Sequence, residues 1–91
     1  MSQWTFLSNH THVLLVLATS QDIVLREVAI KVGITERAVQ RILSELEMEG
    51  FVNREKDGRK NRYTLNLEKP LRHRLERNRT IDELIHLLKK K

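Results

Sequence analysis

Cysteine is absent from this sequence, and it holds only one proline, three glycines and four aromatic residues among its 91 residues. The absence of cysteine excludes disulfides and thiolate metal sites, and it suits a reducing cytosol. Each glycine is expected at a helix end or a turn, so none remains for a phosphate-binding loop. No Ser/His/Asp or Cys/His pattern is present either. The sequence therefore predicts a protein that is not an enzyme and holds no cofactor and no metal.

Long apolar runs are also absent. The longest such run, residues 13–18, is far too short to span a bilayer, and no basic segment precedes it as in a secretory signal. We therefore expect a cytoplasmic protein, associated with the nucleoid if it binds DNA, and no membrane partner.

Charge is plentiful and unevenly distributed. Charged residues make up 32% of the chain and hydrophobic residues 40%, which is typical of one small folded domain. Residues 1–50 carry four basic against six acidic side chains, whereas residues 51–91 carry thirteen against six. This asymmetry indicates a polyanionic partner, with nucleic acid favoured over an anionic membrane because no strongly basic amphipathic helix is present.

Residues 35–50 are marked as a helix at both ends. Thr35 is a preferred N-cap, and Gly50 can adopt the left-handed conformation that closes a helix. One apolar stripe follows the i, i+3, i+4, i+7 spacing: Val39, Ile42, Leu43 and Leu46. Arg and Gln match the major-groove edges of guanine and adenine, and the opposite face carries Arg37, Gln40, Arg41 and Ser44. Taken alone, the helix is equally consistent with an ordinary solvated surface.

A second amphipathic helix is predicted before Thr35, after a break at Ser20-Gln21-Asp22 and a short strand at Ile23-Val24. Its apolar residues have the same spacing: Leu25, Val28, Ala29 and Val32. Gly33-Ile34-Thr35 then supplies a short turn that contains glycine. Two helices joined in this way, the second with Arg and Gln on its free face, predict a helix-turn-helix.

Past Gly50 the pattern becomes that of a β-hairpin. Asp57-Gly58 indicates a tight turn, and Tyr63, Leu65 and Leu67 alternate with polar residues. Basic side chains near the tip could clamp phosphates: Arg54, Lys56, Arg59, Lys60 and Arg62. Arg59 or Lys60 could instead enter the minor groove. The alternative is a hairpin whose charges only keep it soluble.

Together these elements resemble the winged helix-turn-helix of small bacterial MarR/ArsR-like transcriptional regulators. The resemblance rests on the two helices, the turn with glycine, a second helix that ends in Glu49-Gly50-Phe51-Val52, and a basic hairpin that closes on Arg62-Tyr63-Thr64-Leu65. It extends over almost the whole chain through Trp4-Thr5-Phe6-Leu7-Ser8-Asn9-His10, residues 33–42 and Pro70-Leu71-Arg72-His73.

The resemblance implies a homodimer that places two recognition helices in successive major grooves of double-stranded DNA, with its wings on the flanking backbone or minor groove. Carried over to this sequence, the base-proximal set comprises Thr35, Glu36, Arg37, Gln40, Arg41 and Ser44. The wing set comprises Arg59, Lys60 and Arg62. The cysteine pairs of many ArsR-type metal sensors are missing here, so sensing of metals or oxidants through thiols is excluded.

The terminal regions are apolar and need a cover. Ser8 or Asn9 should cap a first helix running through His12 to about Thr19, which packs on the core alone or also on another chain. A capping box at residues 80–83 begins a final helix. Because so short a chain cannot bury both regions in one core, we predict a two-fold interface that contains Trp4, Phe6, Leu7, Leu14, Leu84, Ile85 and Leu88.

The sequence allows more than one interpretation for three sets of polar residues. His10 and His12 point to different sides of a helix, which favours capping or core packing. Asp82 and His86 lie one turn apart, and a solvated helix face is favoured over half of a metal site. A basic run after Pro70 either contacts phosphates or solvates a connecting segment: Arg72, Arg74, Arg77 and Arg79.

We therefore predict one α+β, mainly helical domain over residues 1–91. Residues 5–67 form three core helices and a two- to three-stranded wing sheet, and residues 68–91 form a dimerisation segment with a C-terminal helix. The predicted function is sequence-specific DNA binding by a homodimer that regulates transcription from an inverted repeat. One alternative is a winged-helix protein-interaction module without DNA binding. Another is a regulator with a small-molecule pocket at the dimer interface, near Trp4 and the first helix, whose effector the sequence does not identify.

Overall fold

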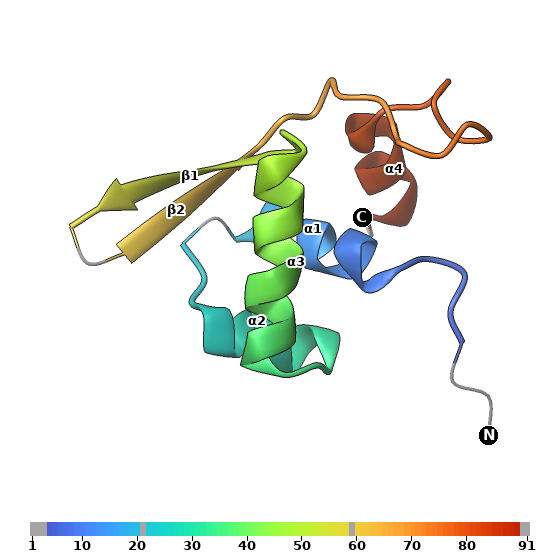
Figure 1. Cartoon of the computed structure of the whole chain (residues 1–91). Helices are drawn as coiled ribbons and strands as arrows, with labels where there is room; N and C mark the ends of the chain where they lie inside the picture. The colour runs from blue at the N-terminus through green and yellow to red at the C-terminus, as the bar shows by residue number, and fades with distance from the viewer. Residues whose placement is uncertain (1–3, 21, 59, 90–91) are drawn as a thin grey trace.

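The computed structural model of the chain describes residues 4–20, 22–58 and 60–89, without the side chains of residues 57 and 60. The elements follow in the order α1 (Asn9–Thr19), α2 (Leu25–Val32), α3 (Glu36–Met48), β1 (Val52–Asp57), β2 (Lys60–Leu65) and α4 (Ile81–Leu88). In Figure 1, α3 crosses the middle of the molecule, the hairpin extends to one side, and α4 and the loop before it lie on the other. The predicted α+β, mainly helical fold is confirmed, with a two-stranded sheet.

The turn between α2 and α3 has the predicted form. Gly33 takes the left-handed conformation with φ +87°, and the N–H groups of Gly33 and Ile34 donate to Ala29 O at 2.8 and 3.0 Å. Thr35 Oγ1 then accepts a hydrogen bond from Ala38 N at 3.1 Å and caps α3. Local capping at both ends of the turn therefore fixes how α3 leaves α2.

A Schellman motif closes α3 and leads the chain directly into the wing. Phe51 N–H donates to Leu46 O at 2.8 Å, Gly50 N–H donates to Glu47 O at 3.1 Å, and Gly50 has φ +83°. Phe51 is buried, and Lys69 Nζ lies 5.4 Å from the centre of its ring. The predicted contact of Phe51 with the end of α3 is thus confirmed, and β1 begins at the next residue.

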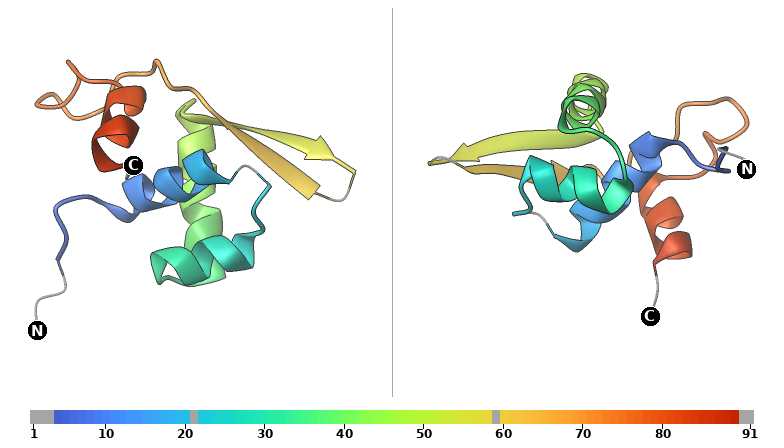
Figure 2. Two further views of the ribbon diagram at one scale, coloured as in Figure 1. Left: turned by 180° about the vertical axis from the view of Figure 1, so that it is seen from behind. Right: turned by 90° about the horizontal axis from the view of Figure 1, so that it is seen from below.

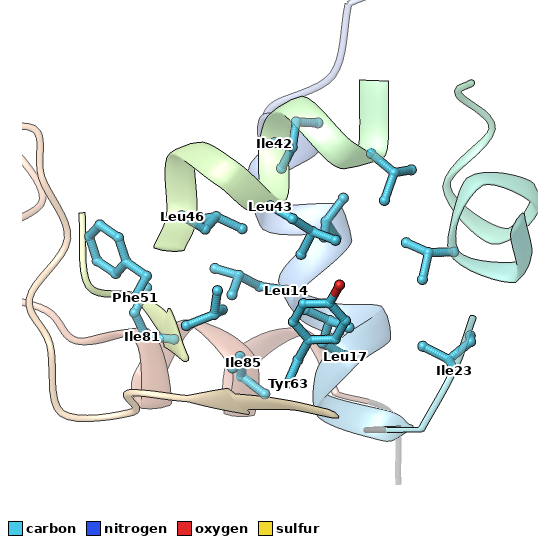
Figure 3. Packing of buried hydrophobic residues seen from close by; sticks show 14 of the residues in the cluster. Leu14, Leu17, Ile23, Ile42, Leu43, Leu46, Phe51, Tyr63, Ile81 and Ile85 are labelled. Carbon is cyan, nitrogen blue, oxygen red and sulfur yellow. The ribbon is translucent and has the colours of Figure 1, made fainter. Parts of the chain in front are cut away.

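The core receives side chains from every helix and from the hairpin. Figure 3 shows the inward residues of α1 and α3 meeting Tyr63 of β2 and Ile81 and Ile85 of α4. Burial of one large aliphatic side chain stabilises the fold by about 1.5–3 kcal/mol, and the side chains with almost no exposure are Leu17, Ile42, Val13, Val28, Val39 and Val52. The expectation that one chain could not bury both terminal regions was wrong for Leu14, Ile81 and Ile85, because α4 packs on α1 of the same chain.

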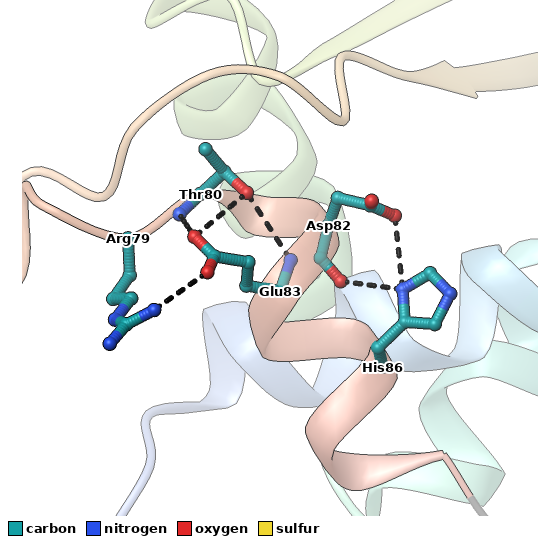
Figure 4. A network of polar contacts seen from close by, with 5 residues as sticks. All are labelled: Arg79, Thr80, Asp82, Glu83 and His86. Carbon is teal, nitrogen blue, oxygen red and sulfur yellow. Dashed lines mark hydrogen bonds and ion pairs between the residues drawn. The ribbon is translucent and has the colours of Figure 1, made fainter.

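The final helix starts with the predicted capping box. Glu83 N–H donates to Thr80 Oγ1 at 3.2 Å, and Thr80 N–H donates to Glu83 Oε1 at 3.0 Å. Figure 4 shows Arg79 Nη1 donating to the other carboxylate oxygen of Glu83, at 2.8 Å. The backbone hydrogen bond from Thr80, followed by the bond from Arg79, lowers the pKa of Glu83 below its ordinary value of 4.5.

Three local predictions differ from the structure. Among the described residues no strand pairs with Ile23 and Val24, so they form no strand; Ile23 is buried in the core and Val24 is the N-cap residue of α2. The strands pair from Val52 with Leu65 to Asp57 with Lys60, so β2 ends before Leu67, which is exposed. Ser8 occupies the N-cap position of α1 but its side chain makes no capping hydrogen bond.

Candidate nucleic-acid interface

The outward face of α3 gathers the predicted base-proximal side chains. The helical period that buries Val39, Ile42, Leu43 and Leu46 turns the polar residues of the same helix to solvent. All six predicted residues are exposed: Thr35, Glu36, Arg37, Gln40, Arg41 and Ser44. Within the described part of the chain, no carboxylate lies within 4.0 Å of Arg37 or Arg41. The guanidinium groups of the first half of α3 are therefore available to an external acceptor.

The second half of α3 and its C-cap residue Glu49 carry three acidic side chains, each with a basic partner. Glu45 Oε1 lies 2.7 Å from His10 Nε2. The other two pairs are longer, with 3.6 Å between Glu47 and Arg54 and 3.9 Å between Glu49 and Arg72. The hydrogen bond from His10 lowers the pKa of Glu45 below its ordinary value of 4.5, and the charges of His10, Arg41 and Arg72 act in the same direction. The carboxylate form of Glu45 therefore persists to a lower pH than that of an ordinary glutamate.

The hairpin presents its basic residues on two faces. Cross-strand neighbours share a face, so Arg54 and Lys56 lie on the face of buried Tyr63, whereas Arg62 lies on the face of Glu55. Arg62 Nε is 3.4 Å from Asp22 Oδ1. Two of the predicted wing residues are therefore engaged by carboxylates, Arg54 with Glu47 and Arg62 with Asp22.

Of the three remaining wing residues, only Lys56 has a side chain that the structure describes. Lys56 is exposed and has no carboxylate within 4.0 Å among the residues that the structure describes. Arg59 and the side chain of Lys60 lie outside the described residues. The sequence did not indicate the partners Asp22 and Glu47, because each pair joins residues from different elements.

Only part of the predicted dimer set reaches the surface of the chain. Leu14 and Ile85 are buried within the chain itself, and Leu7 and Leu84 are half-buried. The side chains of Trp4 and Phe6 are 68% and 92% exposed, and their rings meet edge to face with centroids 5.0 Å apart. Leu88 of α4 is exposed as well, and so is its neighbour Leu87, at 80%, which was not among the predicted residues.

A hollow of about 240 Å³ lies where α1, the end of α3 and α4 meet. Its rim is polar, with His10, Glu45 and Arg72, and its inner wall includes the apolar side chains of Phe51 and Ile81. Residues of α1 line this hollow, as expected for an effector site near the first helix, but Trp4 does not.

His12 and His86 have partners within one helical turn. His12 Nδ1 lies 2.9 Å from Asn9 Oδ1, and His86 Nδ1 lies 3.1 Å from Asp82 Oδ1 and 2.9 Å from Asp82 O (Figure 4). No group of three or more His, Cys, Asp or Glu residues with metal-binding geometry is found over 4–20, 22–58 and 60–89. In the same ranges, no helix has the length and apolar character that crossing a membrane requires.

Comparison with known proteins gives one match. The family model described as MarR family matches residues 8–62, which run from the N-cap of α1 into β2 and include α2, α3 and most of the hairpin. The match stops before α4. Searches of curated proteins and of solved structures found no match to the chain.

Proposed function

Because this chain belongs to the MarR family, whose winged helix-turn-helix proteins bind DNA and regulate transcription, we propose that it acts as a homodimer on an inverted repeat in duplex DNA. In this proposal, α3 of each protomer enters a major groove and the hairpin lies on the flanking backbone or minor groove. The two protomers would meet half-sites about one helical turn apart.

The observation that carries the proposal is the exposed polar face of the first half of α3. Arg37, Gln40 and Arg41 stand on the side opposite the core, on a helix whose position is fixed by packing and by caps at both ends. Arg donates bidentately to guanine, and Gln pairs bidentately with adenine. A rigid helix that presents such groups can select a base sequence.

The wing and the terminal segments complete the proposal. Lys56 and the other basic residues of the hairpin supply contacts to phosphates, which add affinity without sequence preference. Exposed apolar side chains at both ends of the described chain supply a surface for the partner protomer: Trp4, Phe6, Leu87 and Leu88.

The proposal is tested by selection from a random pool of duplex DNA at two salt concentrations. An enriched inverted repeat is the expected result, and the repeat would also reveal the half-site spacing. Arg41→Ala should cost about 1–3 kcal/mol at one cognate base pair, because a bidentate contact is lost. Lys56→Ala serves as the matched control, since loss of a phosphate contact should weaken all sequences alike and flatten the salt dependence.

Two results would contradict the proposal. If Arg41→Ala and Lys56→Ala had the same effect on selected and random DNA, the division between α3 and the wing would be wrong. If the protein bound no duplex even at low salt, the exposed Trp4 and Phe6 would point instead to a protein-interaction module.

A further inference from the structure

A second basic segment lies away from the wing, in the loop that connects the hairpin to α4. The loop leaves the body of the protein at Pro70 and returns at Thr80, and these two residues form an antiparallel bridge. Next to the bridge, Leu71 N–H donates to Arg79 O at 2.9 Å. The two ends of the loop are therefore fixed against each other and against the start of α4.

Further hydrogen bonds fold this loop internally. Glu76 N–H donates to His73 O at 2.7 Å, and Arg79 N–H donates to Glu76 O at 2.9 Å. Leu75 N–H donates to the His73 ring at Nδ1, at 3.1 Å. Residues 71–79, which we name the arginine loop, thus form a compact surface loop with its own turns and not an extended linker.

The arginine loop carries four arginines and one glutamate. Two of the arginines have partners, because Arg72 lies 3.9 Å from Glu49 and Arg79 lies 2.8 Å from Glu83. Arg74 and Arg77 are exposed, and no carboxylate among the described residues lies within 4.0 Å of either. Packing does not account for these two guanidinium groups, so both are available for an anionic ligand.

The loop and the wing flank α3 from opposite sides. Figure 1 shows the hairpin on one side of α3 and the arginine loop on the other. In the right-hand view of Figure 2, both extend beside α3, while α4 points away from it. A duplex that holds α3 in its major groove can therefore extend over both flanks.

We propose that Arg74 and Arg77 of the arginine loop bind the phosphate backbone of the same duplex, on the flank opposite to the wing. This inference rests on the proposed DNA-binding function and adds a second backbone contact to it. Guanidinium groups match phosphate oxygens bidentately, and such contacts position a protein without reading bases. The loop would therefore hold the register of α3 from one side as the wing holds it from the other.

The test compares two double variants that each remove two positive charges. Arg74→Ala/Arg77→Ala changes the arginine loop, and Lys31→Ala/Lys89→Ala changes exposed lysines at the ends of α2 and α4. Binding to the selected duplex is measured across a fourfold range of salt concentration. Each phosphate contact contributes about 0.9 to the slope of log affinity against log salt.

Because each protomer of the dimer loses two arginines, the loop variant should lower that slope by about 3.6, so that a fourfold rise in salt costs about 150-fold less affinity than in the wild type. The base preferences should stay unchanged, and hydroxyl-radical protection should disappear only on the backbone at one flank of each half-site. The lysine variant should keep the wild-type slope and footprint.

Two outcomes would overturn the proposed loop contact, and a third would overturn the proposed DNA-binding function. A wild-type slope and footprint for the loop variant would overturn the loop contact while leaving the proposed function intact. An equal loss of slope in both variants would attribute the effect to overall charge, and would also overturn it. Failure of the wild-type protein to bind any duplex would instead contradict the proposed function itself.

Discussion

In the first half of α3, the outward arginines Arg37 and Arg41 make no ion pair with a described residue, whereas the acidic side chains of the second half and of the C-cap residue Glu49 each have a basic partner. These partners come from three segments that lie far apart in sequence: His10 of α1, Arg54 of β1 and Arg72 of the arginine loop. The first half is therefore open to a ligand. The second half ties α1, the wing and the arginine loop to the helix between them.

The largest expected effect is on the free energy of unfolding, and it distinguishes the inward from the outward face of α3. Ile42 is 2% exposed, so Ile42→Ala should lower the free energy of unfolding by about 2–5 kcal/mol through lost burial and a residual cavity. The neighbouring Arg41→Ala changes an exposed side chain and should stay within about 0.5 kcal/mol. Urea denaturation of both variants gives the comparison. A loss at Arg41 as large as that at Ile42 would show that Arg41 serves the fold.

The next effect concerns the end of α3. Gly50→Ala should destabilise the protein by about 1–2 kcal/mol, because an L-residue is strained at φ +83°. A Cβ there would meet only the side chain of Lys69 at 3.7 Å, which is ordinary contact, so the cost is conformational. Gly33→Ala is the matched control, with φ +87° and no atom within 4 Å of the added Cβ. Denaturation midpoints of the two variants should fall by similar amounts.

A clearly larger loss at Gly50 than at Gly33 would contradict this purely conformational account. It would mean that the junction between α3 and β1 also carries packing that the substitution disturbs, through Phe51 and the hydrogen bond to Leu46.

The helices and their ends were predictable from the sequence because the residues that mark them are close together in the chain. The cap at Thr35, the left-handed glycines at 33 and 50, and the capping box at Thr80 each depend on residues within one helical turn. The apolar stripe of α3 follows from the helical period alone. Local chemistry was therefore enough to predict the helix-turn-helix, the wing and the face of α3 that is exposed.

What could not be predicted depends on contacts between distant segments. The pairs Arg54 with Glu47 and Arg62 with Asp22 arise only when the hairpin packs beside α3 and the segment that precedes α2. Ile23 has the β-branched character typical of a strand, but core packing decides its conformation instead. Chain length limits how much surface a protein buries, but it does not predict which face of a helix is buried. The burial of Ile85 against α1 was therefore missed.

A smaller effect on stability, with a clear effect on DNA binding, is expected from the paired carboxylates. Glu47→Gln/Glu49→Gln removes two negative charges and releases Arg54 and Arg72. Exposed ion pairs contribute about 0–1 kcal/mol each, so stability should change little. The affinity for duplex DNA at low salt should rise, because phosphates meet less repulsion and more available guanidinium groups.

The control for this variant is Glu27→Gln/Glu68→Gln, which removes the same charge from exposed positions outside α3. Both variants are compared by titration of one duplex at two salt concentrations. An equal gain in affinity for the two variants would show that only net charge matters, and that the second half of α3 has no special part in restraining the basic residues.

The smallest expected effect is the dependence of stability on acid. The pKa of Glu45 is lowered in the folded protein by the hydrogen bond from His10, relative to an ordinary value of 4.5. The resulting stabilisation is therefore complete above that ordinary value and is lost as the pH falls through the lowered pKa. Glu45→Gln keeps an acceptor for His10 but does not titrate. Its free energy of unfolding should decrease less steeply between roughly pH 5 and pH 3 than that of the wild type.

His10→Ala removes the donor while leaving Glu45 titratable, so it should flatten the acid dependence in the same way. Glu83, with its pKa lowered first by the backbone of Thr80 and then by Arg79, titrates in both variants and should leave them a shared residual slope. Only the difference from the wild type therefore reports on α3. If both variants followed the wild-type profile, the contact between His10 and Glu45 would not hold α1 to the second half of α3 in solution.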